Sequence, residues 1–156
     1  MATAKIKRIL LAEDNDNDVE LTLTALQECR LRNEVEIVRD GADALDYIYQ
    51  RGKYADRAEG LPCVVLLDLK MPRVDGLEVL RQIKSDPALR KIPVVMLTSS
   101  REEKDLVQSY DLGVNAFVVK PVDFDQFLNA IRSLGMFWAL VNETPPVTSS
   151  IGGVSQ

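Results

Sequence analysis

Short apolar runs recur along the 156-residue chain, and they predict its strands. Five runs are visible, at residues 6–12, 35–38, 63–67, 94–97 and 116–119. Four of them lead directly into polar residues that can carry chemistry: Glu13 with Asp14, Asp68, Thr98, and Lys120. Continuous aliphatic runs, rather than strict alternation, are typical of strands buried on both faces of a parallel sheet.

Segments with helical periodicity separate these runs. Apolar positions three or four residues apart predict five helices, at about residues 16–29, 40–49, 77–84, 100–112 and 123–141. Asp16 or Asn17 can cap the first helix, and Asp40 and Asp123 can cap two later ones. Residues 51–61 are polar and contain two glycines, so they predict a loop.

Strands that alternate strictly with helices predict an α/β fold. The expected architecture is a doubly wound, five-stranded parallel sheet with helices on both faces and right-handed crossovers. The common five-stranded order, 2-1-3-4-5, has its switch point between the first and third strands. Glu13 and Asp14 end the first strand and Asp68 ends the third, so their carboxylates should meet where such folds bind ligands.

Composition indicates one ordinary globular domain. Hydrophobic residues make up 46% of the chain and charged residues 28%. We expect the domain to span residues 5–141, including an extended last helix, and residues 142–156 to form a tail rather than an output domain. No apolar run approaches the roughly 20 residues that cross a bilayer, and no signal-peptide pattern is visible. We therefore expect a cytoplasmic protein without a membrane partner.

Charge and missing residue types exclude several functions. The net charge is −5, and no basic stripe interleaved with aromatic residues is present, so nucleic-acid binding is not expected. The chain has no histidine, which excludes an internal phosphohistidine donor, a Ser-His-Asp triad and a histidine-ligated metal. Cys29 and Cys63 have neither the number nor the spacing of a disulfide framework or zinc site. Carboxylates, Lys and Thr must therefore carry any chemistry.

The predicted acidic edge suits a divalent cation and a phosphoryl group. Clustered carboxylates raise one another's pKa or bind a cation, and hard oxygen ligands in a partly open site suit Mg²⁺. The carboxylate of Asp68 can then attack phosphorus and form an acyl phosphate. The Lys120 ammonium and the Thr98 hydroxyl are placed to contact the phosphoryl oxygens.

These motifs resemble the receiver domains of response regulators, the CheY-like family of two-component signalling, which has a flavodoxin-like fold. The matching residues are Glu13-Asp14, Asp68 with Met71-Pro72 and Asp75-Gly76, Thr98-Ser99, and Lys120-Pro121. The resemblance covers about residues 5–132. It implies a signalling protein rather than an enzyme, one that only phosphorylates and dephosphorylates itself.

The resemblance also implies roles for individual residues. Asp68 would accept a phosphoryl group from a sensor histidine kinase, and Thr98 and Lys120 would contact that group. The ligands of Mg²⁺, or of Mn²⁺, would be Glu13, Asp14, Asp68 and the backbone carbonyl of Lys70. Thr98 and Phe117 would form the conformational switch, and the bond before Pro121 would be cis. Many receivers carry Asn where this chain has Lys70.

A narrower resemblance lies in the flanking segments. They are similar to the stand-alone regulators that partner cyanobacterial phytochromes, the Rcp type. The similar segments are Gly52-Lys53-Tyr54, residues 109–113, residues 120–124, and Phe137-Trp138. This resemblance implies a phytochrome as the kinase and an unknown downstream protein as the target of the signal.

The last predicted helix carries more apolar residues than one sheet-facing stripe needs. Phe137, Leu140 and Val141 lie off that stripe. The tail could fold back over them, but we favour a homodimer through this helix because two-fold association is the commonest oligomer type.

Two other functions remain open from the sequence. An Asp-nucleophile phosphatase or phosphotransferase acting on small molecules normally carries a second Asp two residues after the nucleophile, and this chain has Lys70 there. A flavodoxin-like cofactor binder would need a phosphate-binding loop after the first strand. Here that loop, residues 13–18, is acidic and would repel a phosphate.

Overall fold

Five strands form one parallel sheet in the order β2-β1-β3-β4-β5, as the sequence predicted. The computed structural model describes residues 7–29, 33–58, 60–99 and 111–134. The strands are β1 (Ile9–Ala12), β2 (Val35–Val38), β3 (Val64–Asp68), β4 (Val94–Thr98) and β5 (Ala116–Val119). The first strand begins three residues later than predicted, and the third and fourth each include the polar residue at their carboxyl end.

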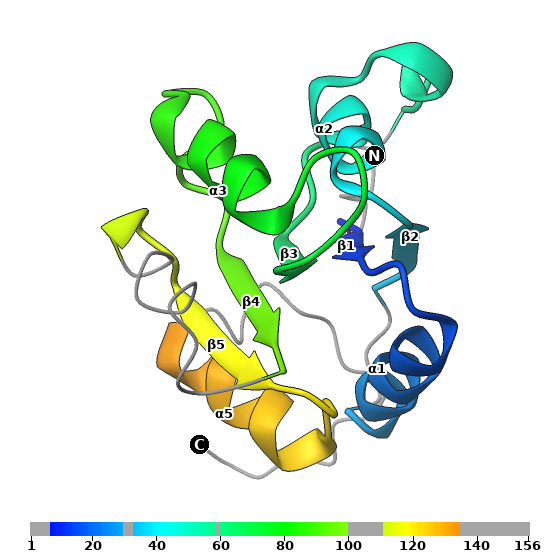
Figure 1. Ribbon diagram of the computed structural model, residues 1–156, viewed down its shortest axis with the longest axis vertical. Helices are drawn as coiled ribbons and strands as arrows, with labels where there is room; N and C mark the ends of the chain where they lie inside the picture. The colour runs from blue at the N-terminus through cyan, green and yellow to red at the C-terminus, as the bar shows by residue number, and fades with distance from the viewer. Residues whose placement is uncertain (1–6, 30–32, 59, 100–110, 135–156) are drawn as a thin grey trace, which may run out of the picture.

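Helices cover both faces of the sheet (Figure 1). Four α-helices lie within the described ranges: α1 (Asp16–Glu28), α2 (Gly41–Tyr49), α3 (Gly76–Ser85) and α5 (Phe124–Leu134). Helices α2 and α3 lie on one face, and α1 and α5 lie on the other. The helix predicted at residues 100–112 falls mostly outside the described residues, as does the predicted extension of the last helix with Phe137, Leu140 and Val141.

The core is split by the sheet into two apolar clusters. All residues of β1, β3 and β4 are buried, which confirms the prediction from their uninterrupted aliphatic runs. Side chains of one strand alternate between the clusters. On the α2/α3 face the cluster includes Leu10, Leu67, Met96, Ile48 and Leu80. On the α1/α5 face it includes Leu11, Leu66, Leu97, Phe127 and Ile131.

Strand register brings the polar ends of the strands to one edge. Ala12 is paired with Leu67, so the next residues, Glu13 and Asp68, leave the sheet at the same level. The backbone N–H of Lys120 donates to the carbonyl of Thr98 at 2.7 Å, which aligns the ends of β4 and β5. The topology therefore gathers these residues from four separate parts of the chain.

Side-chain caps fix where the helices begin. Asp40 accepts a hydrogen bond from the Asp43 backbone N–H, and Asp123 accepts one from Gln126, as predicted. The predicted cap of α1 was wrong, because Asn15 accepts from the Asp18 N–H and Asp16 is already helical. Five consecutive Asx residues, at positions 14–18, made that start ambiguous.

The segment at residues 51–61 is more ordered than the predicted loop. It contains a short 3₁₀ helix, Gly52–Tyr54. The guanidinium of Arg57 donates to the carbonyl of Tyr47 at 2.8 Å and lies over the Tyr47 ring, 4.2 Å from its centroid. The rings of Tyr47 and Tyr54 meet edge to face at 5.1 Å. These contacts fasten the segment to the end of α2.

No helix in the described ranges combines the length and the apolar character that crossing a membrane requires.

Candidate functional site

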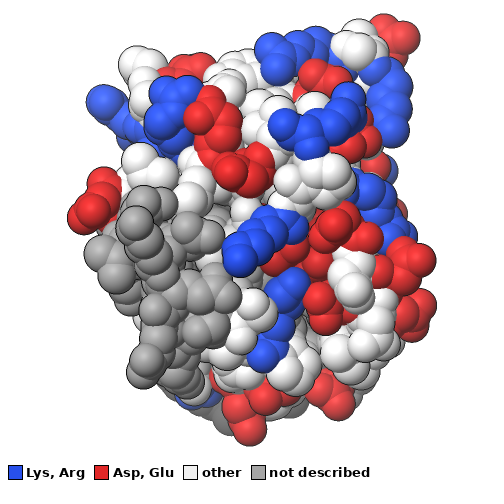
Figure 2. All heavy atoms as spheres, in the orientation of Figure 1, with Lys and Arg blue, Asp and Glu red and all other residues white. Residues whose placement is uncertain are grey.

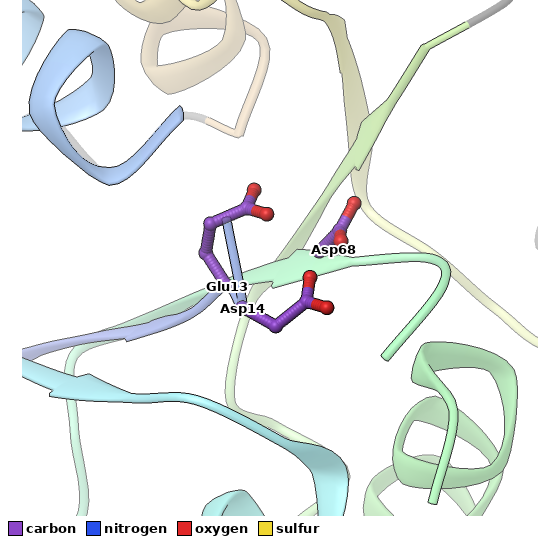
Figure 3. Close-up of side chains that lie close together, drawn as sticks. All are labelled: Glu13, Asp14 and Asp68. Atoms are coloured by element: carbon purple, nitrogen blue, oxygen red, sulfur yellow. The ribbon is translucent and has the colours of Figure 1, made fainter. Parts of the chain in front are cut away.

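Three carboxylates from separate strand ends converge on one point. Glu13 and Asp14 follow β1, Asp68 ends β3, and one oxygen from each lies within 4.8 Å of the others (Figure 3). The structure thus brings together the three carboxylates that the sequence assigned to the site. Hard oxygen donors at this spacing fit a divalent cation such as Mg²⁺ or Mn²⁺.

A cavity of about 220 Å³ opens beside these carboxylates. A water molecule takes up about 30 Å³ in the liquid, so the cavity has room for a hydrated ion or a phosphoryl group. Its lining residues are Glu13, Asp14, Asn15, Asp18, Asp68, Leu69, Lys70, Ser99 and Lys120. The site therefore offers both ligands and space.

The three carboxylates differ in their contact with solvent. Glu13 is 0% exposed and Asp68 is 5% exposed, whereas Asp14 is exposed. The Asn15 backbone N–H donates to Glu13 Oε2 at 3.2 Å, which helps to hold Glu13 inside. A cation bound between them would keep waters on the Asp14 side, the arrangement that Mg²⁺ prefers.

Lys120 connects the acidic groups. Its ammonium Nζ lies 3.0 Å from Asp68 Oδ1, 3.2 Å from Glu13 Oε1 and 3.0 Å from Asp18 Oδ2. It follows β5, and the Lys120–Pro121 peptide bond is cis, as the resemblance implied. The lysine side chain is only 14% exposed, so these ion pairs are largely shielded from water.

Asp18, which the sequence analysis did not assign to the site, also belongs to this network. It is the third residue of α1, and helical side chains lean toward the amino end. Its carboxylate therefore reaches back over the site to Lys120. The partner lies 102 residues away in the chain, so no local pattern could have identified the pair.

The remaining predicted residues of the site differ in how close they lie to the cavity. Thr98 is 1% exposed at the end of β4, and its neighbour Ser99 lines the cavity. Lys70 is exposed and also lines the cavity. Phe117 is half-buried on β5, paired in register with Met96, and it packs on the α2/α3 side of the sheet. The switch role of Thr98 and Phe117 stays a prediction.

Electrostatics make the site short of positive charge. Burial raises the pKa of the Glu13 carboxyl to about 7, and the neighbouring Asp68 adds to the rise. Burial also raises the pKa of Asp68, while Lys120 acts in the opposite direction. Burial works against the Lys120 ammonium, but hydrogen bonds to Asp18 and Asp68 raise its pKa overall. Several carboxylates sharing one ammonium need a further cation, which fits a metal site.

The backbone behind Asp68 is packed against the start of α3. A Cβ atom at Gly76 would lie 2.1 Å from the Asp68 carbonyl oxygen, so only glycine fits there. The Gly76 N–H donates to the Leu69 carbonyl at 2.8 Å. Asp75 caps α3 by accepting a hydrogen bond from the Glu78 N–H at 2.9 Å.

Acidic and basic side chains are interspersed on the face drawn in Figure 2, where Lys and Arg side chains lie among the Asp and Glu side chains. Carboxylates on this face therefore have cationic neighbours at the surface as well as in the site.

Comparison with known sequences finds one family across most of the chain. The family model of the response regulator receiver domain matches residues 9–132. The probable methanogenesis regulatory protein FilR2 of Methanothrix harundinacea is 39% identical over 137 residues, which cover 88% of this chain and 86% of FilR2. Response regulator Rcp1 of Synechocystis sp. is 38% identical over 132 residues, covering 85% of this chain and 88% of Rcp1.

Solved structures agree with the sequence comparison. The bacteriophytochrome response regulator AtBRR is 64% identical with a TM-score of 0.83, covering 90% of this chain and 100% of AtBRR. The bacteriophytochrome response regulator RtBRR is 61% identical with a TM-score of 0.83, covering 91% of this chain and 86% of RtBRR. The Mn²⁺-bound form of Rcp1 is 37% identical with a TM-score of 0.70, covering 91% of this chain and 99% of Rcp1.

These matches confirm the resemblance to receiver domains and to phytochrome response regulators. Regulators named for bacteriophytochromes share 61% and 64% of their residues with this chain, more than the cyanobacterial Rcp1 does. Receiver domains are signalling proteins that take phosphoryl groups from kinases and bind Mg²⁺ or Mn²⁺ in an acidic pocket. The cluster of Glu13, Asp14 and Asp68 is such a pocket in its composition and geometry.

Proposed function

Because the chain belongs to the response regulator receiver domain family, we propose that it accepts a phosphoryl group on Asp68 from a sensor histidine kinase. The observation that carries this proposal is the convergence of three carboxylates within 4.8 Å, with an ammonium 3.0 Å from Asp68 Oδ1. The site thus combines a nucleophile, a place for a cation and a fixed positive charge.

Each residue has a definite part in the proposed transfer. A carboxylate oxygen of Asp68 attacks the phosphorus of a phosphohistidine on the kinase. The new O–P bond forms as the P–N bond breaks, and the electron pair of that bond stays on the imidazole nitrogen. Lys120 lies close enough to Asp68 to donate to a phosphoryl oxygen.

The residues that would hold Mg²⁺ or Mn²⁺ are Glu13, Asp14, Asp68 and the backbone carbonyl of Lys70. A bound cation supplies positive charge to the phosphoryl oxygens as negative charge develops there. After transfer, Thr98 moves toward the new phosphoryl group and Phe117 turns inward. The altered surface conveys the signal to a downstream protein.

The proposed kinase is a phytochrome. This assignment is supported by the 64% and 61% identity of the chain to AtBRR and RtBRR, which are bacteriophytochrome response regulators. The test compares phosphoryl transfer to this chain from a bacteriophytochrome kinase and from an unrelated histidine kinase at equal concentrations. We expect transfer from the bacteriophytochrome to be at least about tenfold faster, which is roughly 1.4 kcal/mol of discrimination. Equal rates would contradict the phytochrome assignment.

The acceptor residue is tested without a kinase, by intact-protein mass spectrometry after incubation with acetyl phosphate and Mg²⁺. The wild-type chain should gain one phosphoryl group, and chelation of the metal should abolish the gain. Asp68→Asn should gain none. Asp75→Asn is the matched control, because it changes a nearby carboxylate to an amide and keeps a residue that caps helices equally well. Phosphorylated Asp68→Asn would overturn the assignment.

The same sample distinguishes a signalling protein from a small-molecule phosphatase. We expect no steady hydrolysis of a phosphomonoester, because Lys70 occupies the place where such enzymes normally carry a second Asp. Sustained turnover that Asp68→Asn abolishes would favour the enzyme.

We also propose that two copies associate through the predicted end of the last helix, to which the sequence pattern assigns Phe137, Leu140 and Val141. These residues are outside the described ranges, so the proposal depends on the sequence pattern. Sedimentation with and without phosphorylation should show a dimer for the wild type and a monomer for Phe137→Glu. Asn129→Glu, at an exposed position of α5, is the matched control and should remain dimeric. A monomeric wild type in both states would contradict the proposal.

A further inference from the structure

Arg73 has a backbone conformation that is unusual for its residue type. Its φ is +66°, in the left-handed region that side chains other than glycine and asparagine rarely adopt. The Val74 N–H donates to the Pro72 carbonyl at 2.8 Å, so Arg73 is the central residue of a three-residue γ-turn. With a positive φ this turn is the rarer and more strained of the two γ-turn forms. Strain of this kind persists only where other contacts hold it in place.

Those contacts come from the first turn of α2. Arg73 Nε donates to Asp40 Oδ2 at 2.9 Å, and Nη2 donates to Asp40 Oδ1 at 3.0 Å, which makes a two-pronged pair. Nη2 also donates to Asp43 Oδ1 at 3.1 Å. Asp40 Oδ1 is at the same time the cap of α2, since it accepts from the Asp43 N–H at 2.8 Å. One carboxylate therefore starts the helix and holds the arginine.

The strained turn lies in the loop that borders the site. This loop, residues 69–75, runs from Asp68 to α3 and is closed by the hydrogen bond from Gly76 to Leu69. Lys70 lies within it and lines the cavity. Leu69 and Met71 are buried on either side of Lys70, at 3% and 8% exposure, so the loop is anchored at this end by packing.

The other end of the loop rests directly on α2. A Cβ atom at Gly41 would lie 1.8 Å from the carbonyl oxygen of Val74, so the two backbones touch without an intervening side chain. Because Arg73 immediately precedes Val74, its pair with Asp40 fastens this backbone contact from the outside. The loop position next to the cavity is thus tied to the first turn of α2.

We propose that Arg73 is a positioning residue for the metal: its ion pairs with Asp40 and Asp43 clamp the loop onto α2 and preset the Lys70 carbonyl for the divalent cation. This inference rests on the proposed function, which assigns that carbonyl to the metal. The Arg73 side chain is 58% exposed, and exposed ion pairs contribute little to global stability. The clamp therefore acts on the ligand position, and its loss should appear in metal affinity more than in unfolding.

The test measures the dissociation constant for Mn²⁺ by counting free Mn²⁺ with electron paramagnetic resonance. Arg73→Ala and Asp40→Asn should each weaken Mn²⁺ binding about threefold to tenfold, the order of one modest contact. Asn still caps the helix, so Asp40→Asn removes the ion pair and keeps the cap. The double variant should bind no more weakly than the weaker single variant, because both substitutions remove the same clamp.

Simple charge effects predict a different outcome, which sharpens the test. Loss of a cation near the site by Arg73→Ala should strengthen Mn²⁺ binding if only long-range charge matters. Arg81→Ala is the matched control. Arg81 is 54% exposed and pairs with Glu78 on α3, so this substitution also removes an arginine about as exposed as Arg73 from a carboxylate partner. Arg81→Ala should leave the Mn²⁺ dissociation constant unchanged.

Two further variants separate the clamp from folding. Arg73→Gly fits the positive φ without strain, so it removes the ion pairs without straining the turn. Arg73→Gly should still bind Mn²⁺ more weakly than the wild type. Arg73→Lys keeps the positive charge but cannot make the two-pronged pair, so it should recover part of the affinity. With acetyl phosphate, the metal concentration at half-maximal phosphorylation should rise while the maximal rate is unchanged.

Wild-type Mn²⁺ affinity in both Arg73→Ala and Arg73→Gly would overturn the clamp, and so would fully additive losses in the double variant. A wild-type chain that binds Mn²⁺ but gains no phosphoryl group on Asp68 would instead overturn the proposed function. The Mn²⁺ measurements would still decide the clamp in that case, because they do not depend on phosphorylation.

Discussion

Two clusters of charge, one around Lys120 and one around Arg73, are built in opposite ways. Around Lys120, one ammonium that is 14% exposed faces Asp68, Glu13 and Asp18. Around Arg73, one guanidinium that is 58% exposed faces Asp40 and Asp43. The cation of the first cluster is shielded from water, whereas the cation of the second is exposed and pairs with carboxylates that are 15% and 23% exposed.

Their carboxyl groups respond in opposite directions. In the Lys120 cluster burial raises the pKa of Glu13 and of Asp68. In the Arg73 cluster burial is the largest single influence on Asp40 and raises its pKa, but the hydrogen bonds and charge of Arg73, together with backbone N–H groups at the start of α2, lower that pKa overall. Lowered carboxyl pKa values indicate a stabilising pair, whereas raised values indicate charge that still needs a partner. Only the shielded cluster is suited to binding a cation.

The largest expected effect is that of removing the one ammonium from the shielded cluster. Lys120→Met keeps most of the length of the side chain but leaves the buried carboxylates of Glu13 and Asp68 without their ammonium partner. Glu13 and Asp68 are buried, but Asp18 and Lys120 keep some contact with water, so we expect a loss of about 2 to 3 kcal/mol of unfolding free energy at pH 8 without metal, below the full penalty of a deeply buried pair. Urea denaturation measures this, and Mg²⁺ should restore part of the loss. Unchanged stability would mean that the cluster is effectively solvated.

Removing a carboxylate from each cluster should change stability with opposite sign. Asp68→Asn relieves repulsion and burial of charge, so we expect a gain of about 1 kcal/mol without metal. Asp40→Asn removes the Arg73 pair, so we expect a loss below about 1 kcal/mol. Denaturation curves at pH 7 test both. Destabilised Asp68→Asn would show that Asp68 is well compensated by Lys120 alone.

The contribution of Asp40 to folding stability should decrease as the pH falls into the acid range. Because its folded-state pKa is lowered, its stabilising effect is present above the unfolded value of about 3.9 and is lost as pH falls through the folded value. The stability difference between wild type and Asp40→Asn should therefore be constant near neutrality and vanish in acid. A difference that grows as pH falls from 5 to 3 would contradict the lowered pKa.

The smallest expected effect is that of salt on the stability losses caused by substitutions in the two clusters. At about 1 M salt the screening length is near 3 Å, so the already small loss in Asp40→Asn should shrink toward zero. The loss in Lys120→Met should change little, because its partners are shielded from ions. Repeating the urea curves with and without salt measures both. Equal salt sensitivity would remove the distinction between the clusters.

The sequence was sufficient for the sheet and for the meeting of the acidic residues. Uninterrupted aliphatic runs identified buried parallel strands, and the rule for switch points placed Glu13 and Asp14 beside Asp68. The predicted cap of α1 was wrong because Asn15, the actual cap, is one of five neighbouring Asx residues, each able to cap. The 3₁₀ helix was missed because Arg57 holds it through contacts with Tyr47 rather than through local periodicity.

Two parts of the site had no signal in the sequence. The pairing of Asp18 with Lys120 joins residues 102 positions apart, and nothing in either neighbourhood indicates the other. The turn at Arg73 was hidden because arginine is not a residue that normally marks a positive φ. Both are fixed by tertiary contacts that only the folded chain supplies.

The absence of a side chain at Gly76 has a practical consequence. The carbonyl of Asp68 and the first turn of α3 are in direct contact there, so a methyl group would have to push them apart. Displacement of the acceptor backbone must therefore be transmitted to the α3 axis as a rigid-body shift. An environment-sensitive dye on the solvent side of α3 would report, in real time, what happens at the acceptor without touching it.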